Sequence, residues 1–284
     1  MASGRGTGSQ PEREGAMSEV EERFVEINHR RCRIWEKGKG EAVGFLPGLG
    51  GAPRWTPFLD RIAARRRAIV VSPPGFPGSE GHDLLDERLD WVVALLDLLE
   101  AAGLEGKDLV GASVGASLAA EAAAVGRGLV RRLVLIAPFG FFDEREPTTD
   151  VWAQKPRELP GLLLSSHPER FQEIFECRTD ADSADAMEWE IQQARAMESA
   201  ARWLWPLGDT RIGKRLHRVT RPALLVWGAD DRVIPPSYAK RFEQGIAGPV
   251  SVRSIPRAGH LAEIDQPDAV ADAVLEFLES PIGH

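Results

Sequence analysis

The chain has 284 residues, of which 43% are hydrophobic and 27% charged, and its formal net charge is −8. This length suffices for one large α/β core with an inserted subdomain, or for two modest domains. The negative net charge argues against nucleic acids and anionic membranes, which bind a basic face, so we expect neither as a partner. The two cysteines, Cys32 and Cys177, lack metal-ligand spacing. We therefore expect no disulfide framework, no metal, no cofactor and a reducing, cytoplasmic location.

Residues 1–20 are rich in Gly, Ser, Arg and Glu and contain no apolar stretch. This composition predicts a disordered N-terminal tail, and the missing apolar region disfavours a secretory signal peptide. Further along the chain, the longest apolar run spans residues 91–99 and is interrupted by Asp97. It is too short for a membrane span, so we predict none.

After the tail, strand-like and helix-like segments alternate, which is typical of a mostly parallel sheet flanked by helices. Residues 22–28 and 31–36 predict a short antiparallel pair of strands. A buried strand, a helix and a second buried strand follow at residues 42–46, 55–64 and 68–72.

The next segment, residues 86–102, predicts a long amphipathic helix because apolar residues recur at helical spacing: Leu89, Val92, Val93, Leu95, Leu96 and Leu99. A strand at 108–111 then passes directly into an Ala-rich helix at 114–124. The remaining core elements are expected to be strands at 133–137, 223–227 and 250–255 and a closing helix at 267–279.

Between residues 140 and 219 the pattern changes to helical stretches with proline breaks and no strand signal. Four of the eight tryptophans lie here, namely Trp152, Trp189, Trp203 and Trp205. We predict a helical cap at 140–219, inserted into an α/β core formed by residues 21–139 and 220–284.

The sequence Gly111-Ala112-Ser113-Val114-Gly115 has the form G-x-S-x-G and lies where an apolar strand turns into a helix. In this setting the motif is a nucleophile elbow, in which a strained turn exposes the serine hydroxyl. Glycines at both ends remove Cβ atoms where strand and helix cross closely. Ser113 is therefore the candidate nucleophile.

A serine nucleophile requires a base and an orienting acid. Among the six histidines, His260 lies in the loop after the last predicted strand. The acid is expected in the segment at 227–235, which follows another strand and offers Asp230 and Asp231. Serine, aspartate and histidine would then all lie at the carboxyl ends of parallel strands, where ligands bind in such sheets.

The glycine-rich segment at 46–51 follows the strand at 42–46 and can bring a backbone N–H close to a substrate. Together with the Val114 N–H it would stabilise the oxyanion of a tetrahedral intermediate.

From about residue 22 to 280, these motifs resemble the α/β-hydrolase superfamily. The resemblance extends to the turn at 74–79 after the fourth strand and to Gln266-Pro267 at the final helix. It implies an α/β-hydrolase fold with an inserted helical cap, Leu49 and Val114 as oxyanion donors, and Asp231 as the acid, with Asp230 as the fallback. Pro47 stands where many relatives have histidine, so a supporting hydrogen bond of the oxyanion loop is lost.

The resemblance implies a serine hydrolase that cleaves an ester or thioester of a small to medium, largely apolar molecule through an acyl-enzyme. We expect the pocket to include Phe139, Phe141, Trp152 and Trp203. One alternative is a carbon–carbon bond hydrolase of aromatic degradation, although Ala112 and Leu261 replace that branch's Asn and Trp. Another is a non-catalytic binding protein on the same fold. Ser113 excludes the branches that use aspartate at the elbow, and a homodimer is left open.

Overall fold

The computed structural model describes residues 19–179, 183–205 and 209–281. Its central feature is an eight-stranded sheet with the order β1-β2-β4-β3-β5-β6-β7-β8. The pairs β1–β2 and β2–β4 are antiparallel, and the other pairs are parallel. The prediction of an α/β fold with a mostly parallel sheet is thus confirmed. Of the predicted tail at 1–20, residues 1–18 lie outside the described residues.

The strands are β1 (Glu21–Ile27), β2 (Arg30–Lys37), β3 (Ala42–Leu46), β4 (Arg67–Val71), β5 (Lys107–Ala112), β6 (Val130–Ile136), β7 (Ala223–Gly228) and β8 (Val250–Ile255). The helices that cover them are α1 (Pro57–Ala63), α2 (Arg88–Ala101), α3 (Ser113–Val125), α7 (Ala239–Gly245), α8 (Ala262–Asp265) and α9 (Pro267–Glu279). Each predicted core strand and helix coincides with one of these elements.

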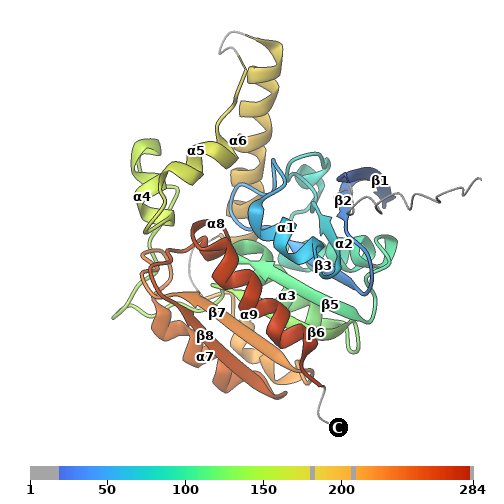
Figure 1. Cartoon of the computed structure of the whole chain (residues 1–284), viewed down its shortest axis with the longest axis vertical. Coiled ribbons are helices and arrows are strands. Elements are labelled where there is room, and N and C mark those ends of the chain that lie inside the picture. The colour runs from blue at the N-terminus through green and yellow to red at the C-terminus, as the bar shows by residue number, and fades with distance from the viewer. Residues whose placement is uncertain (1–18, 180–182, 206–208, 282–284) are drawn as a thin grey trace, which may run out of the picture.

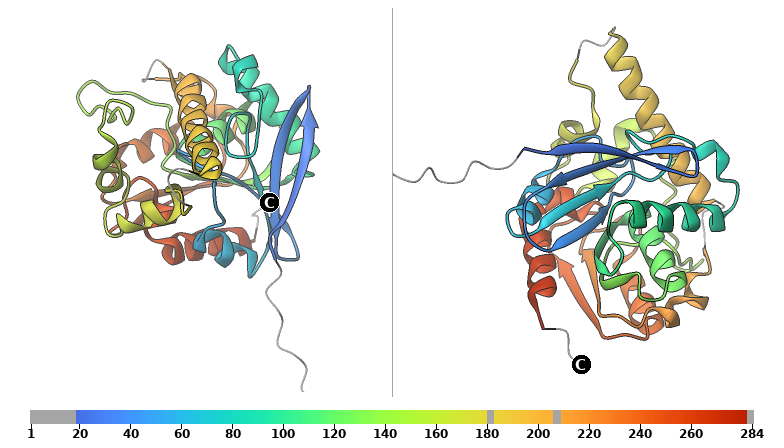
Figure 2. Two further views of the ribbon diagram at one scale, coloured as in Figure 1. Left: turned by 90° about the horizontal axis from the view of Figure 1, so that it is seen from above. Right: turned by 90° about the vertical axis from the view of Figure 1, so that its right-hand side faces the viewer.

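The helices lie on both faces of the sheet, as Figures 1 and 2 show. Side chains along a strand point alternately to its two faces. In β6, Leu133 and Leu135 accordingly join the apolar cluster that includes α2, α3 and α7. Val134 and Ile136 join the cluster that includes α1 and α9. The sheet is therefore buried on both faces, as parallel sheets generally are.

Helix α2 differs from its predicted pattern. Leu89 and Val93 were expected on its buried face, but they are 62% and 46% exposed. The residues that α2 buries are Trp91, Val92, Ala94, Leu95, Leu98 and Leu99. The buried face is thus rotated around the helix from the predicted one, since Trp91 and Ala94 are buried whereas Leu89 and Val93 are not.

The segment between β6 and β7 contains α4 (Leu159–Leu163), α5 (Glu169–Phe175) and α6 (Ala184–Leu204). These helices lie over one edge of the sheet, and α6 extends outward from the rest of the molecule (Figure 1). Apolar side chains from the whole segment between β6 and β7 join the core cluster instead of forming a separate one; they include Val151, Leu163, Phe175, Ala200 and Trp203. Among the described residues, no helix is both long and apolar enough to cross a membrane.

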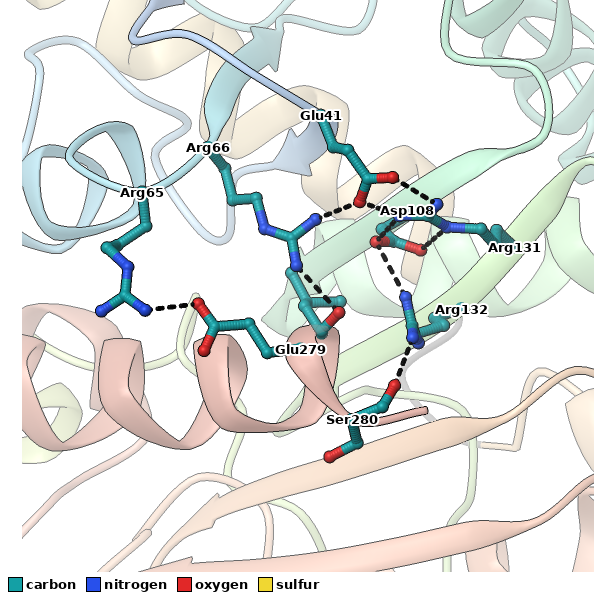
Figure 3. A network of polar contacts seen from close by, with 9 residues as sticks. Glu41, Arg65, Arg66, Asp108, Arg131, Arg132, Glu279 and Ser280 are labelled. Atoms are coloured by element: carbon teal, nitrogen blue, oxygen red, sulfur yellow. Dashed lines mark hydrogen bonds and ion pairs between the residues drawn. The ribbon is translucent and has the colours of Figure 1, made fainter. Parts of the chain in front are cut away.

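A network of charged side chains lies at the other end of the sheet, where β5 and β6 begin (Figure 3). The fully buried carboxylate of Asp108 accepts two hydrogen bonds from Arg131, at 2.9 and 2.7 Å. Glu41 bridges Arg131 to Arg66. Arg132 donates to the backbone carbonyl of Ser280, at 2.5 Å. The network thus joins the starts of the central strands to the end of α9.

Candidate active site

Ser113 lies at the junction of β5 and α3, as the motif predicts. Its φ angle is +51°, in the left-handed region that residues with a side chain rarely adopt. Such strain persists only when the surrounding structure enforces it, and it is frequent at functional sites. The turn directs the Ser113 hydroxyl toward His260.

The two glycines of the elbow are required by close backbone contacts. A Cβ at Gly111 would lie 2.6 Å from the carbonyl oxygen of Gly115. A Cβ at Gly115 would lie 2.4 Å from the carbonyl oxygens of both Leu46 and Pro47. Because backbone atoms cannot give way as a side chain can, neither position tolerates a larger residue. This close packing brings the end of β3 against the elbow.

His260 is buried in the loop between β8 and α8 and contacts both other candidates. Its Nε2 lies 2.7 Å from Ser113 Oγ, and its Nδ1 lies 3.0 Å from Asp231 Oδ2. A carboxylate only accepts hydrogen bonds, so Nδ1 carries the proton and donates it. Nε2 is then left to accept the hydrogen bond of the serine hydroxyl, which is the arrangement of a general base.

Asp231 is held in place by the turn that follows β7. Its Oδ1 accepts hydrogen bonds from the backbone N–H groups of Val233 and Ile234, at 2.8 and 2.9 Å. This leaves Oδ2 for His260. Asp230, the fallback, instead accepts a hydrogen bond from Ser165, at 3.0 Å. The structure therefore brings Ser113, His260 and Asp231 into one hydrogen-bonded chain.

The loop after β3 lies directly beside the serine. A Cβ at Gly48 would be 3.0 Å from the Cβ of Ser113. The loop is closed by a hydrogen bond from Gly51 N–H to the Gly48 carbonyl, at 3.0 Å. Within the described residues, the Leu49 N–H donates to no protein acceptor. Val114 lies in the first turn of α3, whose N–H groups lack intrahelical acceptors. Both predicted oxyanion donors are thus next to Ser113.

A cavity of about 200 Å³ begins at Leu49 and extends beneath the segment between β6 and β7. Its walls are almost entirely apolar and are formed by Leu49, Gly50, Val151, Leu159, Leu163, Phe171, Phe175, Gln193 and Met197. All of these lining residues are among those that the structure describes, and Gln193 is the one with a polar side chain. Its Nε2 is buried without a hydrogen-bond partner in the protein.

None of the four aromatic side chains expected at the pocket is in the lining of this cavity. Phe139 is near the site, with its ring centroid 5.4 Å from that of His260. The indole N–H of Trp152 donates to the carbonyl of Met197, a residue of the lining, at 3.1 Å. The other two need correction, because Phe141 packs edge-to-face against Phe242 and Trp203 donates to Ser117 Oγ. The aromatic residues that do line the cavity, on α5, carried no distinguishing sequence signal.

Within the described residues, no group of three or more His, Cys, Asp or Glu side chains has the arrangement of a metal site.

Comparison with known proteins agrees with this geometry. Residues 45–273 match the family model described as "Alpha/beta hydrolase family". A 2-hydroxy-6-oxononadienedioate/2-hydroxy-6-oxononatrienedioate hydrolase of Comamonas testosteroni is 26% identical, over 92% of this chain and 99% of the relative. A 2-hydroxy-6-oxo-2,4-heptadienoate hydrolase of Pseudomonas putida is 27% identical, over 90% and 95%.

Solved structures show the same fold. A serine hydrolase involved in carbazole degradation superposes with a TM-score of 0.69 at 24% identity, covering 92% of this chain and 99% of the other. A carboxylesterase from Bacillus subtilis superposes with a TM-score of 0.66 at 19% identity, covering 93% of each chain. With its elbow serine on a sheet of this topology and a family model that spans most of its length, the chain belongs to the α/β-hydrolase family and is a serine hydrolase.

Proposed function

We propose that this enzyme hydrolyses esters of small to medium, largely apolar acids, with Ser113 as nucleophile, His260 as general base and Asp231 as its acid partner. The observation that carries the proposal is the continuous chain of hydrogen bonds from Asp231 through His260 to Ser113 at a strained elbow. Covalent acyl transfer requires a nucleophile and a base within hydrogen-bond reach of each other. It also requires a third group that orients the base.

In the first half of the reaction, Ser113 Oγ attacks the ester carbonyl while His260 Nε2 takes its proton. Asp231 stabilises the imidazolium that forms. The N–H groups of Leu49 and Val114 bind the oxyanion, and each such donor contributes about 3 kcal/mol to transition-state stabilisation. The tetrahedral intermediate then collapses to an acyl-enzyme as His260 protonates the leaving alcohol. In the second half, His260 activates a water that releases the acid and restores Ser113.

The cavity supports a neutral, apolar substrate. Its described lining contains neither lysine nor arginine, so a second carboxylate of a substrate would be buried there without a counter-charge. The leucine and phenylalanine side chains of the lining would instead contact an alkyl or aryl group. We propose that the segment at 140–219 acts as the cap that encloses this group.

A second candidate is hydrolysis of a carbon–carbon bond next to a ketone, which the names of the two curated relatives favour. The same serine and histidine could attack a ketone carbonyl. Two observations rank it second: Ala112 and Leu261 stand where that branch typically has Asn and Trp, and the cavity offers no cation for the substrate's carboxylate. A non-catalytic binding protein ranks third, because such proteins usually have a damaged triad.

The decisive experiment combines active-site labelling with a substrate screen. A fluorophosphonate probe should label the wild type at Ser113 and should label neither Ser113→Ala nor His260→Ala. Hydrolysis is then compared for p-nitrophenyl esters of increasing chain length, acyl thioesters and a dienoate diketone. Full esterase activity in Ser113→Ala would overturn the mechanism, and a marked preference for the diketone would establish the second candidate.

Small molecules are thus the expected partners. A homodimer is left open, and sedimentation-velocity analysis of the purified protein would test for one. The cytoplasmic location stays a prediction, which cell fractionation would check.

A further inference from the structure

Glu263 is a buried carboxyl close to the proposed base, and the mechanism makes no use of it. It lies in α8, three residues after His260, and is only 4% exposed. Its Oε2 is buried without a hydrogen-bond partner in the protein. Burial raises the pKa of this carboxyl to about 7, although a hydrogen bond from its own backbone N–H and the nearby His260 both lower it. An apolar side chain would be buried there at far lower cost.

The Glu263 side chain faces a small cavity that it shares with the oxyanion loop. The cavity has a volume of about 20 Å³, which is enough for one water molecule. On the loop side, its walls are Pro47, Gly48, Leu49 and Gly51. The rest of the wall is apolar, apart from the hydroxyl of Thr56 on the loop before α1. Glu263 and the back of the oxyanion loop thus border the same small cavity.

The other charged groups around α8 are engaged elsewhere. On α5, Arg170 donates to the carbonyls of Ile264 and Asp265, and Glu169 pairs with His167. The Asp265 carboxylate accepts hydrogen bonds from Gly259, Ser165, Ser166 and His167.

On α1 and α9, Arg61 pairs with Asp268 and Asp272, and Asp60 pairs with Lys37. Glu173 of α5 is exposed, and Arg54 donates to its carbonyl. Among these titratable side chains, His260 is thus the one that acts on the Glu263 carboxyl.

We propose that Glu263 is a positioning residue whose carboxyl, together with one water in this cavity, braces the oxyanion loop and so fixes the Leu49 N–H relative to Ser113. The inference rests on the proposed ester hydrolysis. Pro47 has removed the side-chain support that many relatives obtain from a histidine in this loop, and Glu263 supplies support from the opposite side. The neutral carboxyl can both donate and accept, as a bridge from a water to backbone groups requires.

Ionisation of Glu263 would alter this arrangement. The carboxylate loses its donor and places a negative charge beside the loop that has to bind an oxyanion. Turnover should therefore decline as Glu263 ionises. The variant that tests this is Glu263→Gln. Its turnover should not decline in this way, because an amide donates and accepts at every pH and carries no charge.

The test compares Glu263→Gln and Glu263→Met with the wild type on p-nitrophenyl butyrate. Methionine fills the cavity with an apolar chain of similar length and cannot hold the water. It should lower kcat about tenfold with KM changed less than about twofold, because oxyanion binding acts in the transition state. Glu263→Gln should keep kcat near wild type at pH 6 and exceed it increasingly above pH 7. Glu276→Met, which removes an exposed carboxyl of α9, should match the wild type.

A folded Glu263→Met with unchanged kcat would overturn the proposal and leave Glu263 as a packing residue. If Glu263→Met does not fold, the pH profile decides, since a Glu263→Gln profile identical to wild type would equally overturn it. Ser113→Ala, assayed in parallel, separates the two hypotheses. Activity retained in Ser113→Ala would refute the proposed ester hydrolysis. If Ser113→Ala is inactive but Glu263→Met has the kcat of the wild type, only the proposed role of Glu263 in supporting the oxyanion loop is refuted.

Discussion

The Asp265 carboxylate accepts a hydrogen bond from the backbone N–H of Gly259, the residue before His260, at 2.8 Å. The same carboxylate accepts hydrogen bonds from the N–H groups of Ser165 and His167, at 2.6 and 2.9 Å. Asp265 is fully buried. One side chain of the core thus joins the loop that carries the proposed base to the segment that leads into α5 and the substrate cavity.

Asp265→Asn should lower both stability and turnover. An amide accepts at one end only, so its NH₂ would face backbone N–H donors that also lose their acceptor. The expected cost in unfolding free energy, measured by urea denaturation, is about 1–3 kcal/mol. We expect kcat on p-nitrophenyl butyrate to fall at a temperature where the variant is folded, since His260 loses its fixed position. The exposed Asp268→Asn is the control, and equal effects of the two would refute this role.

The two neighbouring aspartates of the β7 turn should differ sharply in their effect on catalysis. Asp231→Asn would no longer hold the Nδ1–H tautomer of His260, and we expect kcat to fall about 10³- to 10⁴-fold. Asp230 accepts a hydrogen bond from Ser165, which the Oδ1 of an asparagine can still accept, so Asp230→Asn should stay within about threefold of the wild type. Steady-state kinetics of the two purified variants check this. Comparable losses would mean that the acid has been assigned to the wrong residue.

Much of this site could be predicted because its signals are local in sequence. The elbow motif depends on contacts between near neighbours, such as the approach of Gly111 to Gly115. Ser113, Asp231 and His260 each follow a strand, and parallel strands align their carboxyl ends at one edge of the sheet. The buried strands could be predicted equally well, because a short apolar run bounded by turn residues fits few structures other than a buried strand.

The substrate cavity could not be predicted, because its walls come from segments whose relative placement no local pattern encodes. Phe141 and Trp203 are as aromatic as Phe171 and Phe175, yet the former pair packs into the core. Asp265 meets its partner Ser165 across 100 residues of chain. Such contacts depend on how the segment between β6 and β7 lies on the sheet, which tertiary packing decides.

The charged network where β5 and β6 begin should stabilise the folded protein without affecting turnover. Asp108→Asn leaves Arg131 and Arg132 without their buried partner (Figure 3). Breaking a buried ion pair from one side typically costs about 3–5 kcal/mol, to be measured as unfolding free energy. The kcat of the folded variant should be unchanged, because Asp108 lies near the start of β5 whereas Ser113 follows the other end of that strand. The control Arg65→Ala removes an exposed pair with Glu279 and should cost at most about 1 kcal/mol.

Glu263 should make the stability of the protein depend on pH between about 4.5 and 7. Its pKa is raised from 4.5 to about 7 in the folded protein, so the native state binds a proton that the unfolded chain releases. This contribution is fully present below pH 4.5 and is lost as pH rises through 7, and its size is on the order of 3 kcal/mol. Glu263→Gln should remove it. The measurement is the unfolding free energy in urea at pH 5 and at pH 8. The difference between these two values should be smaller in Glu263→Gln than in the wild type. Equal differences would contradict the prediction.

Gln193 should determine whether the cavity distinguishes a polar acyl chain from an apolar one. Its buried Nε2 lacks a partner in the protein, so a substrate carbonyl that reaches it would gain a hydrogen bond in an apolar surrounding. We expect Gln193→Leu to lower kcat/KM for p-nitrophenyl 4-oxopentanoate about tenfold, which corresponds to about 1.4 kcal/mol.

For p-nitrophenyl pentanoate, which has the same chain without the ketone, kcat/KM should stay the same or rise, because leucine adds apolar contact. Gln192→Leu is the matched control. Gln192 is the preceding residue of α6, bonds to Glu188 and lines a different pocket, so its loss should affect neither substrate. If Gln193→Leu changes both esters by the same factor, the amide only shapes the cavity, and the preference for a hydrogen-bond acceptor must be abandoned.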